Sequence, residues 1–193
     1  QPPLLLYDSP TAGLDPITAH TIIALLVKER DLADTTTLIV THRYQDGNLM
    51  ANFRYNSETG SLEPAHNGER ETAETTFMVM KEGRLVQQGP PALIYRKPVS
   101  EYVGGLFGRY NLFQVDPAMP DKMAFLRPDD LEFTTGPYYD FEGRVVRLSF
   151  LGPYYEIHVD VGGQLLIVFE SRPTVSVGER VRLAILPERV HFL

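Results

Sequence analysis

The sequence contains no cysteine and no tryptophan among its 193 residues. Without thiols the chain can form neither a disulfide nor a thiolate metal site, which fits a reducing compartment. No apolar run approaches the ~20 residues of a membrane-spanning helix, so we expect no such helix. Basic residues are outnumbered, with 18 Lys and Arg against 25 Asp and Glu and a net charge of −7. That balance argues against a nucleic-acid-binding surface.

The sequence also has no initiator methionine and no signal peptide, and it opens directly on Gln1-Pro2-Pro3 and an apolar run. We therefore expect it to be a fragment of a longer protein. The hydrophobic content of 43% and the charged content of 22% are ordinary for a globular protein. The length suffices for one large domain or two small ones with real cores.

The stretch 3–16, PLLLYDSPTAGLDP, organises the first half of the chain. Its apolar run ends on the carboxylate of Asp8, and Pro10 then prevents continuation of a central strand because proline has no N–H for the ladder. Asp15-Pro16 is typical of a helix N-cap followed by proline at the first helical position. The pattern predicts a buried strand that carries Asp8 to its carboxyl end.

The residues after Pro16 predict a helix that ends near Asp31, with apolar side chains at near-helical spacing. These are Ile17, Ile23, Leu26 and Val27. The β-branched run 35–42, TTTLIVTH, predicts a second buried strand. Strand, helix and strand form a βαβ unit with parallel strands. Asp8 and His42 should therefore meet at one edge of the sheet, where open α/β sheets bind ligands.

An apolar strand, the run D-S-P-T-A-G-L-D-P and a second strand ending in T-H resemble the C-terminal part of an ABC-transporter ATPase domain, from the Walker B strand onward. The resemblance implies ATP and Mg²⁺ as cofactors, with Asp8 holding the metal through its water shell. It also implies that Ala12 to Asp15 form the D-loop at a dimer interface, with Asp15 as the D-loop acid of the nucleotide site. His42 would contact the γ-phosphate and the attacking water. Without the family, Asp8 is a turn-capping acid and His42 a core histidine.

Ser9 departs from the family, which usually has Glu directly after the Walker B Asp. A hydroxyl can hydrogen-bond a water but cannot act as its base near pH 7. Hydrolysis at this catalytic position is therefore slow, absent or dependent on another group. The Gly-rich phosphate loop, the Q-loop and the LSGGQ signature all precede Walker B in the family, and the sequence contains none of them. We expect this chain alone to be inactive and to have negligible ATP affinity.

The segment 43–76 predicts a local elaboration with a short helix at 43–53, a hairpin or loop at 56–64 and an exposed polar stretch at 67–75. It has some similarity to ATPases of lipid-trafficking ABC systems. A hairpin should follow at 75–89, with its turn at Glu82-Gly83. Short helices should then follow on Pro90-Pro91 and after Pro98.

From about residue 111 the pattern alternates with a period of two and is punctuated by Gly-Pro and Gly-Gly turns, which predicts a small antiparallel barrel. In the run 155–161, alternation places Glu156, His158 and Asp160 on a wet face. The C-terminal stretch resembles the TOBE-type, OB-like domain that is appended to importer ATPases for sugars, sulfate, molybdate, polyamines or ferric iron. Arg127, Asp129 and Asp130 are either a small-ligand contact or, as we favour, a solvated charge cluster in a turn.

The predicted fold class is α/β: the C-terminal part of a P-loop (RecA-like) ATPase domain at 1–108, followed by a small all-β OB-like (TOBE) barrel at 109–193. The implied function is energy coupling in an ABC importer. Implied partners are a second ATPase subunit, with which the chain would form a homodimer, and transmembrane permease subunits at the inner face of the cell membrane. A small-molecule regulator at the barrel is a further candidate partner. Alternatives are a non-hydrolysing ABC-type module, a lipid-trafficking ATPase, and the barrel alone as an oxyanion-binding or interaction domain.

Overall fold

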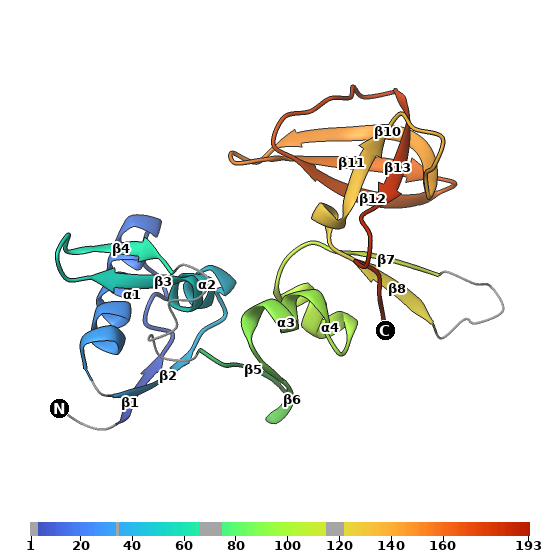
Figure 1. Ribbon diagram of the computed structural model, residues 1–193. Coiled ribbons are helices and arrows are strands. Elements are labelled where there is room, and N and C mark those ends of the chain that lie inside the picture. Colours follow the sequence, from blue (N-terminus) through green and yellow to red (C-terminus); the bar gives the residue numbers. More distant parts are fainter. Residues whose placement is uncertain (1–3, 34, 66–74, 115–121) are drawn as a thin grey trace. The chain divides into compact units, whose positions relative to one another are not determined.

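Figure 1 shows the computed structural model of the chain, which describes residues 4–33, 35–65, 75–114 and 122–193. Contacts divide the chain into two compact units, Gln1–Ala92 and Leu93–Leu193. This division lies earlier in the chain than the boundary expected at 108/109. Residues 93–108 make more of their contacts with the second unit than with the first.

The first unit contains β1 (Leu4–Asp8), α1 (Pro16–Leu32), β2 (Thr36–Val40), α2 (Tyr44–Asn52), β3 (Phe53–Asn56), β4 (Ser61–Pro64), β5 (Phe77–Lys81) and β6 (Arg84–Gly89). β1 and β2 pair in parallel, with Leu4 opposite Thr36 and Asp8 opposite Val40. The predicted strand–helix–strand unit is therefore confirmed. Because both strands end together, Asp8 and the residues after Val40 lie at the same edge of the sheet.

Helix α1 begins as the sequence predicts, with Pro16 in its first turn and Asp15 as its N-cap. Its buried side chains are Ala19, Ile23, Leu26 and Val27. Ile17 belongs to the predicted apolar spacing but does not face the core, because its side chain is 81% exposed. At 3.6 residues per turn, Ile17 lies roughly 200° around the helix from Ala19 and so faces away from the core.

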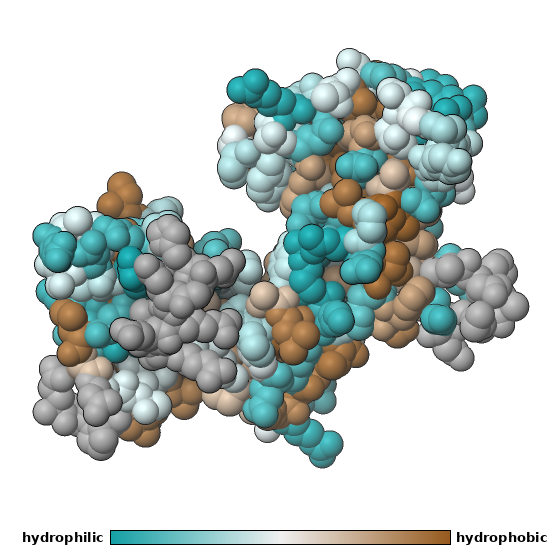
Figure 2. Space-filling view, viewed as in Figure 1, coloured by the Kyte–Doolittle hydropathy of each residue, from teal (hydrophilic) through white to brown (hydrophobic). Residues whose placement is uncertain are grey.

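β1 and β2 were predicted to be buried strands, but only one face of each is covered within the described residues. Tyr7 and Ile39 pack against the core of α1. The alternate side chains are exposed, with 66% of Leu6 and 59% of Val40 accessible. Within the described residues the sheet has only these two strands, and α1 covers one face of it. Brown, apolar surface is visible at the lower edge of this unit in Figure 2, where Figure 1 draws the two strands.

The short helix predicted after His42 is present as α2, and the segment predicted as a hairpin or a loop forms part of the antiparallel pair β3–β4. The hairpin shares the core of α1, because Tyr55 and Leu62 pack against its buried side chains. At the end of α1, the Arg30 guanidinium donates to the carbonyls of Met50 and Phe53. The elaboration is thus an integral part of the first core. Residues 67–74 of the predicted polar stretch lie outside the described residues.

Strands β5 and β6 form the predicted antiparallel hairpin. Both turn residues have positive φ, 51° at Glu82 and 73° at Gly83. Positive φ at both central positions is the geometry that matches the right-handed twist of a two-residue hairpin. Glycine provides this conformation without steric cost at the second position.

The chain continues with α3 (Pro91–Arg96), α4 (Glu101–Leu106), β7 (Asn111–Gln114), β8 (Met123–Leu126), a 3-10 turn η1 (Pro128–Asp130), β9 (Leu131–Thr134), β10 (Phe141–Phe150), β11 (Tyr155–Val161), β12 (Gln164–Glu170), β13 (Arg180–Ile185) and β14 (His191–Phe192). The strands form a five-stranded sheet in the order β12-β11-β10-β13-β9 and a three-stranded sheet in the order β14-β8-β7. All neighbours are antiparallel. β7 was not predicted, because a four-residue strand carries too little alternation to be recognised.

Both sheets of the second unit contribute to one core. Its most buried members include Leu126 of β8, Val145 of β10, Ile157 of β11 and Leu183 of β13. A register shift between Val145 and Arg147 marks a bulge in β10. Bulges bend a strand and increase its twist, which lets a small sheet curl around its core. Apart from the short turn η1, the described elements from β7 to β14 are all strands, so the predicted all-β character of the chain after residue 108 is confirmed.

Candidate functional site

The predicted site residues Asp8 and Ser9 lie where β1 ends. Asp8 is exposed, and the Ser9 hydroxyl donates to its Oδ1 at 3.0 Å. The Ser9 amide donates to the carbonyl of Val40 at 2.7 Å, which extends the strand pairing by one residue. Ser9 has φ of 48°, in the left-handed region that non-glycine residues rarely adopt. Such a conformation costs on the order of 1–3 kcal/mol and often occurs at functional sites.

The turn from Ser9 to Asp15 is closed by its own backbone. The Ala12 amide donates to the Ser9 carbonyl at 2.9 Å, and the Leu14 amide donates to the Thr11 carbonyl at 3.3 Å. Asp15 accepts from the Ile17 and Thr18 amides and from the Thr18 hydroxyl. The hydrogen bond from the Thr18 side chain is the main reason that the pKa of Asp15 lies below its ordinary value. The carboxylate of Asp15 therefore stays charged while it caps α1.

His42 follows β2 by two residues and is exposed. Within the described chain, no hydrogen bond or ion pair to its imidazole is present. Asp8 and Val40 are register partners, so Asp8 and His42 emerge from the same edge of the sheet, as the sequence predicts. The chemical roles assigned to both residues remain predictions.

A group of residues that sequence reasoning missed lies behind this edge. Asp46 in the first turn of α2 is 3% exposed, and Thr11 in the turn after β1 is 1% exposed. The Thr11 hydroxyl donates to Asp46 Oδ2 through a short hydrogen bond. One signal was available: Asp46 precedes the inward-facing Met50 by four residues, which places an acid on the buried face of the helix.

A magnesium ion would be held by few protein groups here. Among the described residues, no cluster of three or more His, Cys, Asp or Glu side chains could hold a metal. Asp8 presents a single exposed carboxylate, and Ser9 occupies one of its oxygens. Mg²⁺ keeps several waters and is commonly bound by one or two carboxylates together with phosphates of the substrate. The donor set at Asp8 fits that mode of binding.

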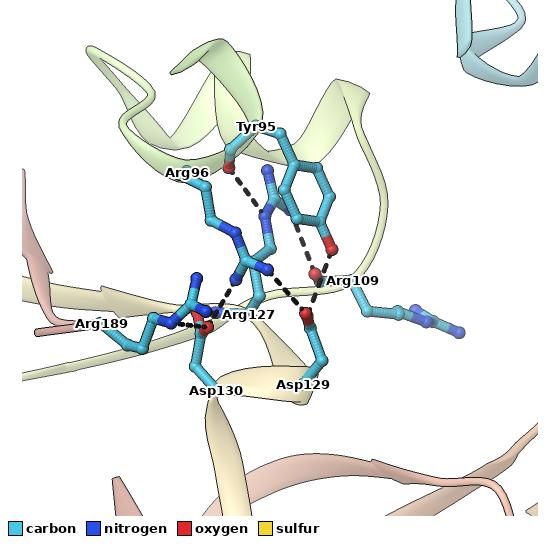
Figure 3. Close-up of polar contacts among 7 residues, drawn as sticks. All are labelled: Tyr95, Arg96, Arg109, Arg127, Asp129, Asp130 and Arg189. Atoms are coloured by element: carbon cyan, nitrogen blue, oxygen red, sulfur yellow. Dashed lines mark hydrogen bonds and ion pairs between the residues drawn. The ribbon is translucent and has the colours of Figure 1, made fainter. Parts of the chain in front are cut away.

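The cluster at Arg127, Asp129 and Asp130 is not the solvated turn that we favoured. Arg127 is 1% exposed and Asp130 is 2% exposed. The Arg127 guanidinium donates to the carbonyls of Tyr95, Gly104 and Arg109 at 3.0, 3.0 and 3.1 Å. It also lies over the rings of Tyr95 and Phe125. The arginine thus joins α3, α4 and the residues before β7 to strand β8 (Figure 3).

Both acids of this cluster pair with arginines (Figure 3). Arg96 lies 3.0 Å from Asp129 and 2.5 Å from Asp130, and Arg189 approaches Asp130 at 3.9 Å. Burial raises the pKa of Asp130, and burial together with the charge of Asp129 raises the pKa of Tyr95 to about 12. The contacts made by the cluster are with the chain itself, which favours a structural role over a small-ligand contact.

Glu156 is a second correction to the sequence reading. It was assigned to a wet face of β11, but it is 4% exposed. Its carboxylate lies 2.8 Å from His158 Nε2 and 3.2 Å from Arg109 Nε. Alternation correctly separates Glu156 from the core-facing Ile157 but does not reveal that other groups cover the opposite face.

A hollow of about 500 Å³ lies on the second unit, between β9, β10 and β13. Arg180, Arg182 and Glu142 line it. Glu142 lies 2.7 Å from Arg180 Nε and 4.0 Å from Arg182 Nε, so its carboxylate offsets the positive charge of the hollow. None of the residues lining this hollow belongs to the Asp8 edge.

Comparison with known proteins gives the family context. Residues 124–193 match the family model described as TOBE domain. The chain is 22% identical over 214 residues to a spermidine/putrescine import ATP-binding protein of Clostridioides difficile, covering 100% of this chain and 55% of the relative. It is 25% identical over 211 residues to the Fe(3+) ions import ATP-binding protein of Escherichia coli, covering 97% and 53%. It is 27% identical over 184 residues to a sulfate/thiosulfate import ATP-binding protein of Synechococcus elongatus, covering 89% and 46%.

The chain thus spans about half the length of the curated relatives it matches. In the described part of the chain, no helix has the length and apolar character needed to cross a membrane. Over 89% or more of its length the chain is similar to import ATP-binding proteins, and its residues 124–193 match the TOBE domain.

Proposed function

We propose that this chain supplies part of the nucleotide site of an ABC importer's ATP-binding subunit and couples ATP binding and hydrolysis to solute uptake. One observation carries the proposal: Asp8 and His42 leave one edge of a parallel strand pair, with the D-S-P-T-A-G-L-D-P turn between β1 and α1. Alignment of the whole chain with importer subunits supports it. In this proposal the first unit is the C-terminal part of a P-loop ATPase domain.

The residues at this edge have distinct proposed roles. Asp8 would hold Mg²⁺ through its water shell, and that ion would neutralise charge on the phosphates of ATP. His42 would donate a hydrogen bond to the γ-phosphate. Its imidazole is exposed and makes no hydrogen bond or ion pair within the described chain, so it is available for that contact. The carboxylate of Asp15 is committed to the N-terminus of α1. Its proposed role at the nucleotide site is therefore to hold the turn in place.

A second candidate function is a half-site that binds ATP without hydrolysing it. The Ser9 hydroxyl donates to Asp8 Oδ1, so in this structure it is directed at the metal-binding carboxylate. A serine hydroxyl is not a base near neutral pH, whereas a positioned general base contributes roughly 10²–10⁴-fold to a rate. Closure of an ATPase dimer driven by ATP binding would not need that base.

The two candidates are separated by ATPase measurements on the intact gene product, comparing the wild type with Ser9→Glu. If Ser9 limits hydrolysis, the variant should turn over at least tenfold faster, a conservative part of the range for a general base. Equal rates would favour a hydrolysing site that uses another group. His42→Ala, introduced into both the wild type and the Ser9→Glu variant, serves as the control, because loss of its hydrogen bond should lower any turnover that the parent protein shows. Absence of both ATP binding and hydrolysis would refute both candidates.

The proposed partners are a second ATP-binding subunit and transmembrane permease subunits at the inner face of the cell membrane. The turn that would face the second subunit is exposed, with 38% of Leu14 accessible. Sedimentation of the intact protein with and without Mg-ATP tests the homodimer, which should form only with nucleotide. The relatives are named for polyamine, ferric iron and sulfate import, and these different names leave the solute of this chain open. No observation favours the lipid-trafficking alternative.

A small-molecule regulator at the TOBE domain is a separate proposal, and the hollow beside Arg180 and Arg182 is its candidate site. Calorimetric titration of the chain with sulfate, molybdate and sugars tests it. Saturable heat that is lost in Arg182→Gln would support a regulator there. Absence of heat with sulfate, molybdate and sugars would refute both the regulator site and the hypothesis that the barrel binds oxyanions.

A further inference from the structure

The carboxylate of Asp46 joins two segments that are far apart in the sequence. Its Oδ2 accepts the short hydrogen bond from the Thr11 hydroxyl and a longer one, 3.4 Å, from the Thr41 hydroxyl. Its Oδ1 lies 3.6 Å from Arg43 Nε. We call Thr11, Thr41, Arg43 and Asp46 the Asp46 cluster. The cluster is a crossing point between the turn after β1 and the segment after β2.

Each of these segments carries one of the proposed site residues. Thr11 lies in the turn that starts at Ser9, directly after Asp8. Thr41 directly precedes His42, and its hydroxyl accepts a hydrogen bond from the Arg43 amide at 3.0 Å. A displacement of either segment would therefore strain the hydrogen bonds of Asp46 to the other. The cluster gives the two sides of the site a common anchor.

Burial makes this anchor specific. Both Thr11 and Asp46 are almost completely removed from solvent. A buried carboxylate is stable only when hydrogen-bond donors or a positive charge compensate for its lost hydration. Here the compensating groups are two hydroxyls and one guanidinium, from both sides of the site. Hydrogen bonds to a charged group are about twice as strong as neutral ones, which favours one fixed arrangement.

We propose that Asp46 is a positioning residue that fixes the Ser9–Asp15 turn and the Thr41–Arg43 segment relative to each other, so that Asp8 and His42 act as one unit. The inference rests on the proposed function for its role in catalysis. The mechanical link itself does not depend on that function. The two parts therefore need separate experiments.

The link is tested in the 193-residue chain by hydrogen exchange of individual backbone amides. Thr11→Val removes the hydroxyl and keeps the shape of the side chain. It should speed exchange about tenfold not only at Ala12 and Leu14 but also at the Arg43 amide, since a charged hydrogen bond of this kind is lost. Thr11→Ser keeps a hydroxyl and should restore exchange to near the wild-type rate at all three amides.

The control is Met50→Ala, which removes a buried side chain from the same helix but leaves all four residues of the Asp46 cluster in place. This variant lowers the stability of the core as a whole and shows how much exchange rises for that reason alone. Faster exchange at Ala12 and Leu14 with no change at Arg43 in Thr11→Val would overturn the link. An equal rise in Thr11→Val and Met50→Ala at all three amides would overturn it as well.

The catalytic role is tested in the intact gene product by steady-state ATPase kinetics. Thr11→Val should lower kcat about tenfold with less than a twofold change in KM for ATP, and Thr11→Ser should recover most of the loss. We expect kcat to change more than KM because the proposed role of the cluster is to set the geometry of the chemical step, and none of its residues has a proposed contact with the nucleotide. A change in KM alone would overturn this role. If the wild type neither binds nor hydrolyses ATP, the proposed function fails, whereas the exchange experiment still decides the link.

Discussion

Replacement of Arg127 by methionine should destabilise the second unit more than any exposed substitution in it. Methionine keeps a long apolar stem but leaves the carbonyls of Tyr95, Gly104 and Arg109 without this donor. It also removes the charge that lies 4.2 Å from the ring centroid of Tyr95 and 4.8 Å from that of Phe125. Helices α3 and α4 would thereby lose their polar connection to β8.

The magnitude follows from these contacts. Each buried acceptor that loses its partner costs about 1–3 kcal/mol, and each cation–ring contact contributes about 0.5–2 kcal/mol. The burial of a guanidinium itself costs several kcal/mol, and its removal offsets part of the loss. We therefore expect a decrease of about 4 kcal/mol in the free energy of unfolding, close to the 3–5 kcal/mol typical of a broken buried ionic contact. Lysine is a compact point charge that cannot span all three carbonyls, so Arg127→Lys should lose about 2 kcal/mol.

Urea unfolding of the whole chain, monitored by hydrogen exchange of the amides in β8 and β9, measures this loss of stability in the second unit alone. With a slope of about 2 kcal/mol per M, the midpoint for Arg127→Met should fall by roughly 2 M. Arg172→Met is the matched control, because Arg172 is exposed. This substitution should change the free energy of unfolding by less than about 0.5 kcal/mol. Equal midpoints for Arg127→Met and Arg172→Met would refute the reasoning.

Three further predictions concern Glu156, Gly143 and nucleotide binding. Burial acts to raise the pKa of Glu156, but His158 and Arg109 outweigh it and hold the pKa below the ordinary 4.5. The ionised carboxylate therefore stabilises the fold above pH 4.5, and this stabilisation is lost as the pH falls through the lower pKa of the folded state. Glu156→Gln should flatten the decline of the melting temperature between pH 5 and 3. Gly143→Ala would push a methyl group against the Asp160 carbonyl and Val159 and should cost about 1–3 kcal/mol in thermal unfolding, with the exposed Val146→Ala as control. The 193-residue chain should give no saturable heat with Mg-ATP, because its sequence has no Gly-rich phosphate loop; a saturable isotherm would contradict this.

Local signals in the sequence predicted the elements well. Asp15 and Pro16 located the start of α1, Glu82-Gly83 located a hairpin turn, and alternation located the strands of the second unit. These features depend on neighbouring residues, whose conformational preferences are legible in the sequence. The edge shared by Asp8 and the residues before His42 followed from parallel pairing alone.

Features that depend on contacts between distant segments were not predictable in the same way. The burial of Glu156 depends on Arg109, which lies far away in the sequence, and the burial of Arg127 depends on carbonyls of α3 and α4. Asp46 was missed for the same reason, because its partner Thr11 precedes it by 35 residues. Alternation and helical periodicity describe one element at a time and do not specify what covers its polar face.

The β3–β4 hairpin has a practical consequence for engineering this protein. Its base cannot be deleted, because Asp31 accepts from the Tyr55 amide at 2.7 Å and the Tyr55 ring packs on the core. Its tip, residues 57–60, is exposed and contributes no buried side chain. A fluorophore or affinity tag inserted at 57–60 would therefore sit on a hairpin whose base is anchored to the core of α1, and it would displace no buried side chain.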